Sequence, residues 1–354
     1  MKNLKLIGFL MILVSSLLFI QCTSDPIAGP QGIAGIDGVD GVDGINGQDG
    51  SDAEASCIAC HSNSNRDPIH TSYAMSGHAA GGAVGYAGGR SGCAQCHSNE
   101  GYIDYMETGA TNPDGYTGQG VIGCTTCHSK HSTFDFENDG HDYALRDFEP
   151  VELIIGSTLD NPSGIIDYEG TSNNCAFCHQ PRRTPPTDDG SGIFNITSSH
   201  YGPHYGAQTT MLEGIQGANI PGSVEYPAPG TATHRTSASC VSCHMGEPNA
   251  DDGAHTFNPS INSCTSCHTS LTELDYHGVQ TEVDELMAEL KTLLTANGVF
   301  DAEGNLITGE HPVGLANAFW NWKFIYQDHS HGVHNPKYTL ALLKNSIEYL
   351  ENLD

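Results

Sequence analysis

The residues from His234 to His268 read HRTSASCVSCHMGEPNADDGAHTFNPSINSCTSCH. They contain two CxxCH motifs, which begin at Cys240 and Cys264, and one further histidine, His255, between them. CxxCH is the attachment motif of a c-type haem, in which both thiols form thioethers to the porphyrin. The adjacent histidine becomes the proximal ligand of the iron, and a second histidine on the opposite face would complete a six-coordinate, low-spin centre. This stretch therefore contains the ligands for two haems.

The same motif occurs six times, uses 12 of the 13 cysteines and leaves only Cys22 over. A zinc site would need paired motifs without an obligatory histidine in fifth position, and a disulfide framework would scatter its cysteines. The sequence therefore predicts six covalently bound haem c groups. The predicted haem-binding cysteines are Cys57, Cys60, Cys93, Cys96, Cys124, Cys127, Cys175, Cys178, Cys240, Cys243, Cys264 and Cys267. The predicted proximal iron ligands are His61, His97, His128, His179, His244 and His268.

Thirteen histidines remain for the distal side of the irons. The predicted distal ligands are His78, His131, His204, His234, His255 and His334. His131 follows His128 by three residues, so we expect it to reach a neighbouring haem and not its own. The other seven are interpreted as solvated or structural histidines. They are His70, His141, His200, His277, His311, His329 and His331.

The N-terminus has the pattern of an export signal. Two lysines precede an apolar run over residues 6–20, which is short for a membrane span and typical of a secretory signal peptide. The run ends at Cys22, which is similar to the acceptor cysteine of a lipoprotein. We expect residues 1–22 to be a lipoprotein-type signal ending at an acylated Cys22, which anchors the chain to a membrane. An ordinary cleaved signal is the alternative.

Every third residue from Gly29 to Gly50 is glycine, which is the period of collagen. Only one proline lies in these triplets, so a triple helix would be marginal. We interpret residues 23–54 as an extended tether, with a trimerising stalk as the alternative. In both cases the segment would hold the haem-binding part away from a membrane surface.

The haem-binding region, 55–278, is rich in glycine, serine and proline and has few long apolar runs. Such a sequence cannot build an ordinary core of this size, so packed haems must supply apolar volume. We predict a mainly α fold with extensive irregular loops, in which short helices carry the CxxCH motifs.

The C-terminal part, 279–354, is predicted to be helical. Apolar residues at helical spacing predict helices over 279–297, 312–328 and 336–352. Asn335 is the expected N-cap of the last helix and Pro336 its first-turn residue. The aromatic residues of the middle helix are interpreted as core.

Several segments resemble those of the cytochrome c nitrite reductase and octahaem cytochrome superfamily. The segment from His331 to Leu343, HGVHNPKYTLALL, is similar to the one before the last helix of that group, where the histidine before Asn-Pro is a distal ligand. That resemblance implies the same role for His334. Segments around His78, His131, His204 and His255 also resemble ligand-bearing segments of multihaem cytochromes. The chain has no CxxCK motif, which the nitrite reductases carry at their catalytic haem, so nitrite reduction is not implied.

The main functional hypothesis is an electron conduit, because an iron with two histidine ligands has no open position for a substrate. We expect an exported, outer-membrane lipoprotein that faces the periplasm or the cell surface and exchanges electrons with redox partner proteins. The net charge of −29 argues against nucleic-acid binding and favours a basic partner. One alternative is a reductase or oxidase of small nitrogen or sulfur compounds with one five-coordinate haem, with Tyr201, Tyr205 or a spare histidine in its pocket. The other is a subunit of a cytochrome filament.

Overall fold

Each of the six CxxCH motifs begins on a short helix. The computed structural model describes residues 55–132 and 143–353, so the predicted signal segment, Cys22 and the Gly-X-Y tether lie outside the described residues. The motif-bearing helices are α2 (Ala55–His61), α5 (Ser91–His97), α7 (Cys124–Cys127), α8 (Asn173–Ala176), α11 (Cys240–His244) and α12 (Ile261–Thr265). One helical turn brings cysteines three residues apart onto the same face, as attachment to one porphyrin requires.

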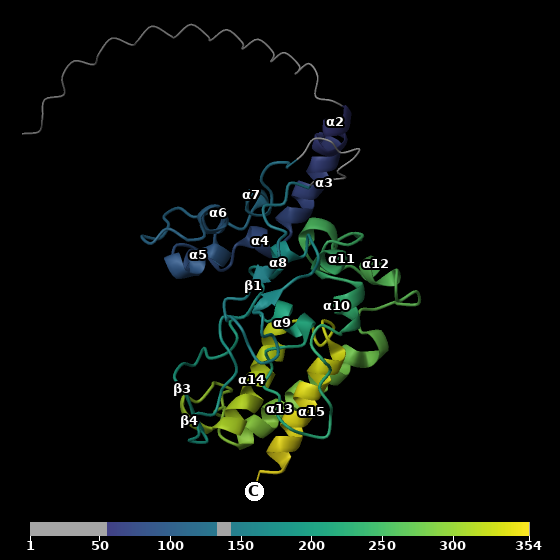
Figure 1. Ribbon diagram of the computed structural model, residues 1–354. Coiled ribbons are helices and arrows are strands. Elements are labelled where there is room, and N and C mark those ends of the chain that lie inside the picture. The colour runs from purple at the N-terminus through teal and green to yellow at the C-terminus, as the bar shows by residue number, and fades with distance from the viewer. Residues whose placement is uncertain (1–54, 133–142, 354) are drawn as a thin grey trace, which may run out of the picture. The chain divides into compact units, whose positions relative to one another are not determined.

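Further short helices connect the motifs. They are α3 (Asn63–Ala74), α4 (Gly77–Ala80), α6 (Asn99–Thr108), α9 (Gln208–Glu213) and α10 (Thr233–Ser237), with single turns at η1 (Val84–Gly88), η2 (Ala254–Thr256) and η3 (Tyr276–Gly278). Figure 1 shows these elements joined by long irregular segments.

The described residues also form two small antiparallel sheets. In one sheet β1 (Val151–Glu152) pairs with β2 (Ile165–Ile166), and in the other β3 (Ile193–Ile196) pairs with β4 (Gly309–Pro312). The second sheet joins the motif-bearing region to the C-terminal part. The fold is therefore mainly helical with extensive irregular loops, which confirms the predicted fold class.

Buried polar side chains hold the irregular segments in place. Asn173, at the start of α8, accepts a hydrogen bond from the Tyr168 backbone N–H at 2.8 Å. Its amide group donates to the Phe148 carbonyl at 3.0 Å and to the Asp167 carboxylate at 2.9 Å. Because Asn173 is fully buried, each of these bonds satisfies a group that would otherwise be costly to desolvate.

Three longer helices form the C-terminal part: α13 (Val279–Ala296), α14 (Val313–Asp328) and α15 (Pro336–Glu351). Their ends agree with the predicted helices to within one residue. The Asn335 side chain accepts the Tyr338 N–H at 3.2 Å, which confirms its predicted role as N-cap.

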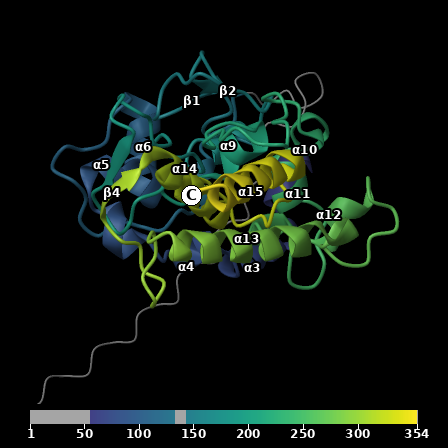
Figure 2. The same ribbon diagram turned by 90° about the horizontal axis from the view of Figure 1, so that it is seen from below.

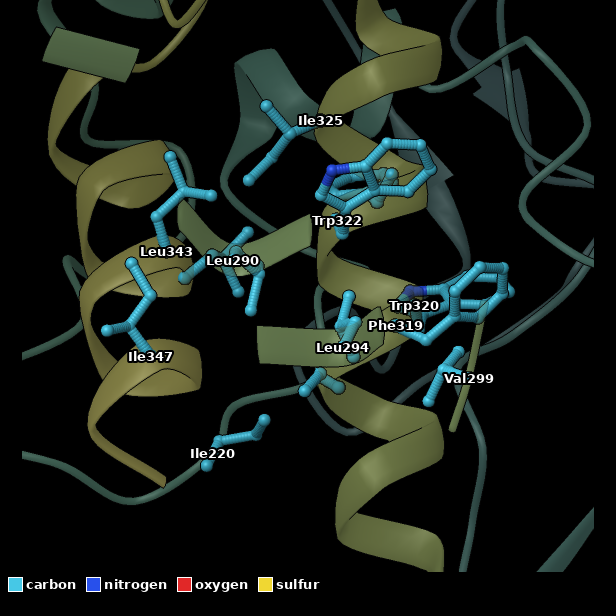
Figure 3. Packing of buried hydrophobic residues seen from close by; sticks show 14 of the residues in the cluster. Ile220, Leu290, Leu294, Val299, Phe319, Trp320, Trp322, Ile325, Leu343 and Ile347 are labelled. Carbon is cyan, nitrogen blue, oxygen red and sulfur yellow. The ribbon is translucent and has the colours of Figure 1, made fainter. Parts of the chain in front are cut away.

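Helices α13, α14 and α15 run side by side and share one hydrophobic core (Figures 1 and 2). Figure 3 shows Leu290 of α13 beside Leu343 of α15, and Leu294 of α13 beside Phe319 of α14. Trp320 is fully buried, and its indole N–H donates to the Gln216 carbonyl at 2.8 Å. The aromatic residues of α14 are thus core, as predicted, and Trp320 fixes α14 against the segment that follows α9.

The motif-bearing region and the C-terminal helices belong to one compact unit, Ala55–Asp354. Within residues 55–132 and 143–353, no helix is long and apolar enough to cross a membrane.

We predict that Leu294→Ala destabilises the haem-loaded protein by about 2–5 kcal/mol, because it removes a fully buried side chain and leaves a cavity. The measurement is guanidinium unfolding followed by far-ultraviolet circular dichroism. The matched control is Leu159→Ala, since Leu159 is 99% exposed and its truncation should change stability by less than about 0.5 kcal/mol. Equal shifts of the midpoint in both variants would contradict the assignment of the core.

Candidate haem sites

Each CxxCH histidine lies opposite one histidine from another segment of the chain. We number the candidate sites 1 to 6 in the order of their motifs. The pairs, with their ring-centroid separations, are His61–His131 (6.1 Å), His97–His204 (6.1 Å), His128–His255 (6.5 Å), His179–His78 (6.2 Å), His244–His334 (6.2 Å) and His268–His234 (6.2 Å). The six partners are the six predicted distal histidines.

The separation within each pair fits one iron between two imidazoles. Metal–nitrogen bonds of about 2.0 Å on both sides would hold the ring centroids roughly 6 Å apart. The observed range is 6.1 to 6.5 Å. In every pair the two cysteines of the motif lie one and four residues before the CxxCH histidine, where they would hold the porphyrin. The residues present therefore fit a haem c at each site.

Backbone carbonyls bind the outer ring nitrogen of several paired histidines. The Nδ1 atoms lie 2.8 Å from the Tyr143 carbonyl in His128, 2.6 Å from the Val333 carbonyl in His234, and 2.8 Å from the Phe257 carbonyl in His244. A carbonyl oxygen only accepts hydrogen bonds, so each Nδ1 must carry the hydrogen. The Nε2 atom of each ring is then left as the lone-pair donor for a metal.

His334 has a different partner, because its Nδ1 donates to Asp328 Oδ1 at 2.6 Å. Asp328 is the last residue of α14, and its side chain is 1% exposed. Burial lowers the pKa of the His334 imidazole, but the Asp328 carboxylate and its hydrogen bond act the other way, and the pKa is raised from its ordinary value. Sequence reasoning assigned no role to Asp328.

Site 2 is held by residues from three segments. The buried Gln327 side chain accepts the backbone N–H groups of His204 and Tyr205, both at 3.1 Å. His204 and Tyr205 have φ values of +81° and +54°, so these bonds stabilise a backbone conformation that non-glycine residues rarely adopt.

On the other side of site 2, the guanidinium of Arg182 donates to the Gly92 carbonyl at 2.9 Å, beside the second motif. Burial, with a smaller effect of Arg182, lowers the pKa of His97 and favours the neutral, metal-binding ring.

Phe257 connects three candidate sites. Its ring centroid lies 4.8 Å from that of His78 and 5.9 Å from that of His255, and its carbonyl accepts from His244. These histidines belong to sites 4, 3 and 5. Burial lowers the pKa of both His78 and His255, which again favours the neutral ring. Phe257 itself has φ +59°, at the end of η2.

The cysteines show which motifs are neighbours. The thiols of Cys96 and Cys178 lie close enough to shift each other's pKa, and so do those of Cys175 and Cys240. The fourth motif therefore lies between the second and the fifth. Cys127 is close enough to Cys175 and Cys178 to interact with both electrostatically, which places the third motif beside the fourth.

The two remaining motifs extend this arrangement at its ends. Cys243 interacts electrostatically with Cys264, so the sixth motif adjoins the fifth. His131 of site 1 is three residues from His128 of site 3, so these two sites share one short backbone segment. The six candidate sites form one connected array with site 4 at its centre.

The other described histidines lie outside the six pairs. His311 is buried and donates its Nε2–H to the Ile307 carbonyl at 2.9 Å, as expected of a structural histidine. His329 stacks on Tyr205, and the exposed His331 pairs with Asp284 at 2.6 Å. His70, His200 and His277 are exposed. His141 lies outside the described residues.

The two tyrosines considered for a substrate pocket lie in different environments. Tyr201 is buried in the main core, with its ring centroid 5.7 Å from that of Trp320, so it is a packing residue. Tyr205 is 60% exposed. Among the described residues, no group of three or more His, Cys, Asp or Glu side chains is arranged to hold a metal ion.

Comparison with known proteins identifies similar chains. No family model matches. The chain is 25% identical over 344 residues to the C-type polyheme cytochrome OmcC of Geobacter sulfurreducens. The match covers 74% of this chain and 43% of the relative, so the chain spans less than half the length of that protein.

The comparison with solved structures finds three cytochromes. The outer cell wall cytochrome OcwA is 20% identical, with a TM-score of 0.47, 80% of this chain covered and 50% of the other. The undecaheme cytochrome from the S-layer of Carboxydothermus ferrireducens is 20% identical, with a TM-score of 0.44 and coverage of 75% and 38%. The cytochrome c nitrite reductase of Desulfovibrio desulfuricans is 16% identical, with a TM-score of 0.30 and coverage of 69% and 57%. The resemblance predicted from the motifs is confirmed: this chain is similar to the multihaem c-type cytochromes.

Proposed function

We propose that the chain is a six-haem c-type cytochrome that transfers electrons between redox partner proteins at the bacterial cell envelope. The observation that carries the proposal is that every CxxCH histidine faces one histidine from elsewhere in the chain at 6.1 to 6.5 Å. When bound, haem c supplies an iron that accepts and releases one electron. With two histidines at each iron, no position remains for a substrate, so this arrangement favours electron transfer over catalysis.

The arrangement of the motifs supports transfer within the molecule. Thiol contacts connect the fourth motif to the second and the fifth, and these cysteines would carry the porphyrin edges. Electrons could then move between neighbouring sites without leaving the protein. Site 4 would be the branch point, with site 2 on one arm, sites 3 and 1 on another, and sites 5 and 6 on the third.

The location at the envelope rests on the N-terminal sequence. The predicted signal segment would export the chain, Cys22 would anchor it through a lipid, and the Gly-X-Y tether would hold the haem-binding part away from the membrane surface. All three features lie outside the described residues.

The wild-type protein provides the first test. We predict six haems per purified full-length chain and an electron paramagnetic resonance spectrum of the ferric protein that is entirely low-spin. A high-spin signal equivalent to about one haem would contradict the proposal and would favour a reductase or oxidase with one open iron.

A single distal ligand provides the second test. We predict that His204→Ala keeps six haems, because the thioethers are covalent, but makes one of them high-spin and able to bind one carbon monoxide per chain when reduced. The control is His200→Ala, four residues away, where the histidine is exposed and outside the pairs. The ligand assignment would be wrong if His204→Ala remained fully low-spin, or if both variants gained the same high-spin signal.

A further inference from the structure

Asp328 is a carboxylate in an unfavourable place. It is the last residue of α14, where the negative end of the helix dipole repels an anion. Its side chain is 1% exposed, and burying an ionised carboxylate is costly unless hydrogen bonds compensate for the lost water. Ending the helix does not require a carboxylate at this position. The carboxylate therefore requires another explanation.

Two donors account for both oxygens of this carboxylate. Oδ1 accepts the Nδ1–H of His334 at 2.6 Å, and Oδ2 accepts the hydroxyl of Ser330. The same Ser330 hydroxyl oxygen accepts the backbone N–H of His334 at 3.3 Å. The turn between α14 and α15 is thus closed around Asp328, and the imidazole of His334 is fixed in one tautomer and one orientation. Its ring centroid lies 6.2 Å from that of His244, and its Nε2 is left as the lone-pair donor for a metal at this site.

Other paired histidines have weaker acceptors on Nδ1. In His128, His234 and His244 the acceptor is a neutral backbone carbonyl. A carboxylate is a stronger acceptor, because charge-assisted hydrogen bonds are shorter and roughly twice as strong. It withdraws the Nδ1 proton toward itself and makes the ring a more basic ligand. Site 5 therefore carries a full negative charge one imidazole away from its iron position.

We propose that Asp328 lowers the reduction potential of the haem at site 5 by stabilising its ferric form. This inference rests on the proposed function, since it requires an iron between His244 and His334. A buried negative charge favours the more positive oxidation state, and burial keeps that charge from being screened by water. Asp328 is a positioning residue, because it acts on the iron only through His334.

The low potential has a consequence for the array. Site 5 lies between site 4 and site 6, through the Cys175–Cys240 and Cys243–Cys264 neighbours. An electron would reside less often at site 5 than it would without the charge of Asp328. Electron exchange between site 6 and the centre of the array passes through site 5 and would feel this charge, while the arms through sites 2 and 3 would not.

The chain offers a matched control for this test. His331 and Asp284 form a histidine–carboxylate pair with the same 2.6 Å distance, but both side chains are more than half exposed and His331 faces no CxxCH histidine in the described structure. Asp284→Asn therefore makes the same chemical change without a candidate iron behind it. Asp328→Asn keeps the shape and one oxygen acceptor but removes the charge.

The experiment is a spectroelectrochemical titration of the haem-loaded full-length protein, with haem content and spin state measured for every variant. We expect Asp328→Asn to raise one of the six midpoint potentials more than any other and to keep six low-spin haems. Asp284→Asn should leave all six unchanged. Ser330→Ala, which removes one donor and leaves more charge for His334, should lower one potential and provides a second test if Asp328→Asn does not fold.

Three results would overturn the inference. They are an unchanged set of potentials in Asp328→Asn with six low-spin haems, an equal rise in Asp284→Asn, or a rise in place of a fall in Ser330→Ala. Fewer than six haems or a high-spin haem in the wild type would instead overturn the proposed function, so the two failures are distinguishable.

Discussion

The fixed separation between paired imidazoles is the constraint on which the rest of this structure depends. An iron bound from both faces tolerates little variation in bond length, yet the two histidines of a pair come from separate segments of the chain. The chain has 42 glycines and 17 prolines and few long regular elements to position them. At His128, His234, His244 and His334, hydrogen bonds at Nδ1 contribute to this rigidity, because they fix both the tautomer and the direction of the ring.

The end of α14 links the hydrophobic core to several candidate sites. Trp320 and its neighbours fix the helix in the core, and its last two residues then position distal ligands. Gln327 holds the backbone of His204, and Asp328 holds the ring of His334. The following turn continues this role, since the Val333 carbonyl binds His234. Sites 2, 5 and 6 therefore depend on one helix end, which gives the C-terminal bundle a function beyond stability.

Local patterns predicted much of the fold, whereas tertiary contacts account for the rest. The CxxCH spacing predicted the short helices, and apolar spacing with the Asn335 cap predicted α15. The six histidines that the sequence predicted as distal ligands are the six that face CxxCH histidines in the structure. Iron binding by them stays a prediction. Which histidine faces which motif could not be predicted, because His131 finds His61 only after the intervening chain has folded. The role of Asp328 was equally hidden, since nothing in its sequence context indicates that it is buried beside a ligand.

The most direct measurement is an anomalous difference map of crystals of the full-length, haem-loaded protein, collected at the iron absorption edge. Six iron peaks should appear, each between the two imidazoles of one of the six pairs, with site 4 nearest to sites 2, 3 and 5. A missing peak, or an iron whose CxxCH histidine faces anything other than its paired histidine, would contradict the account.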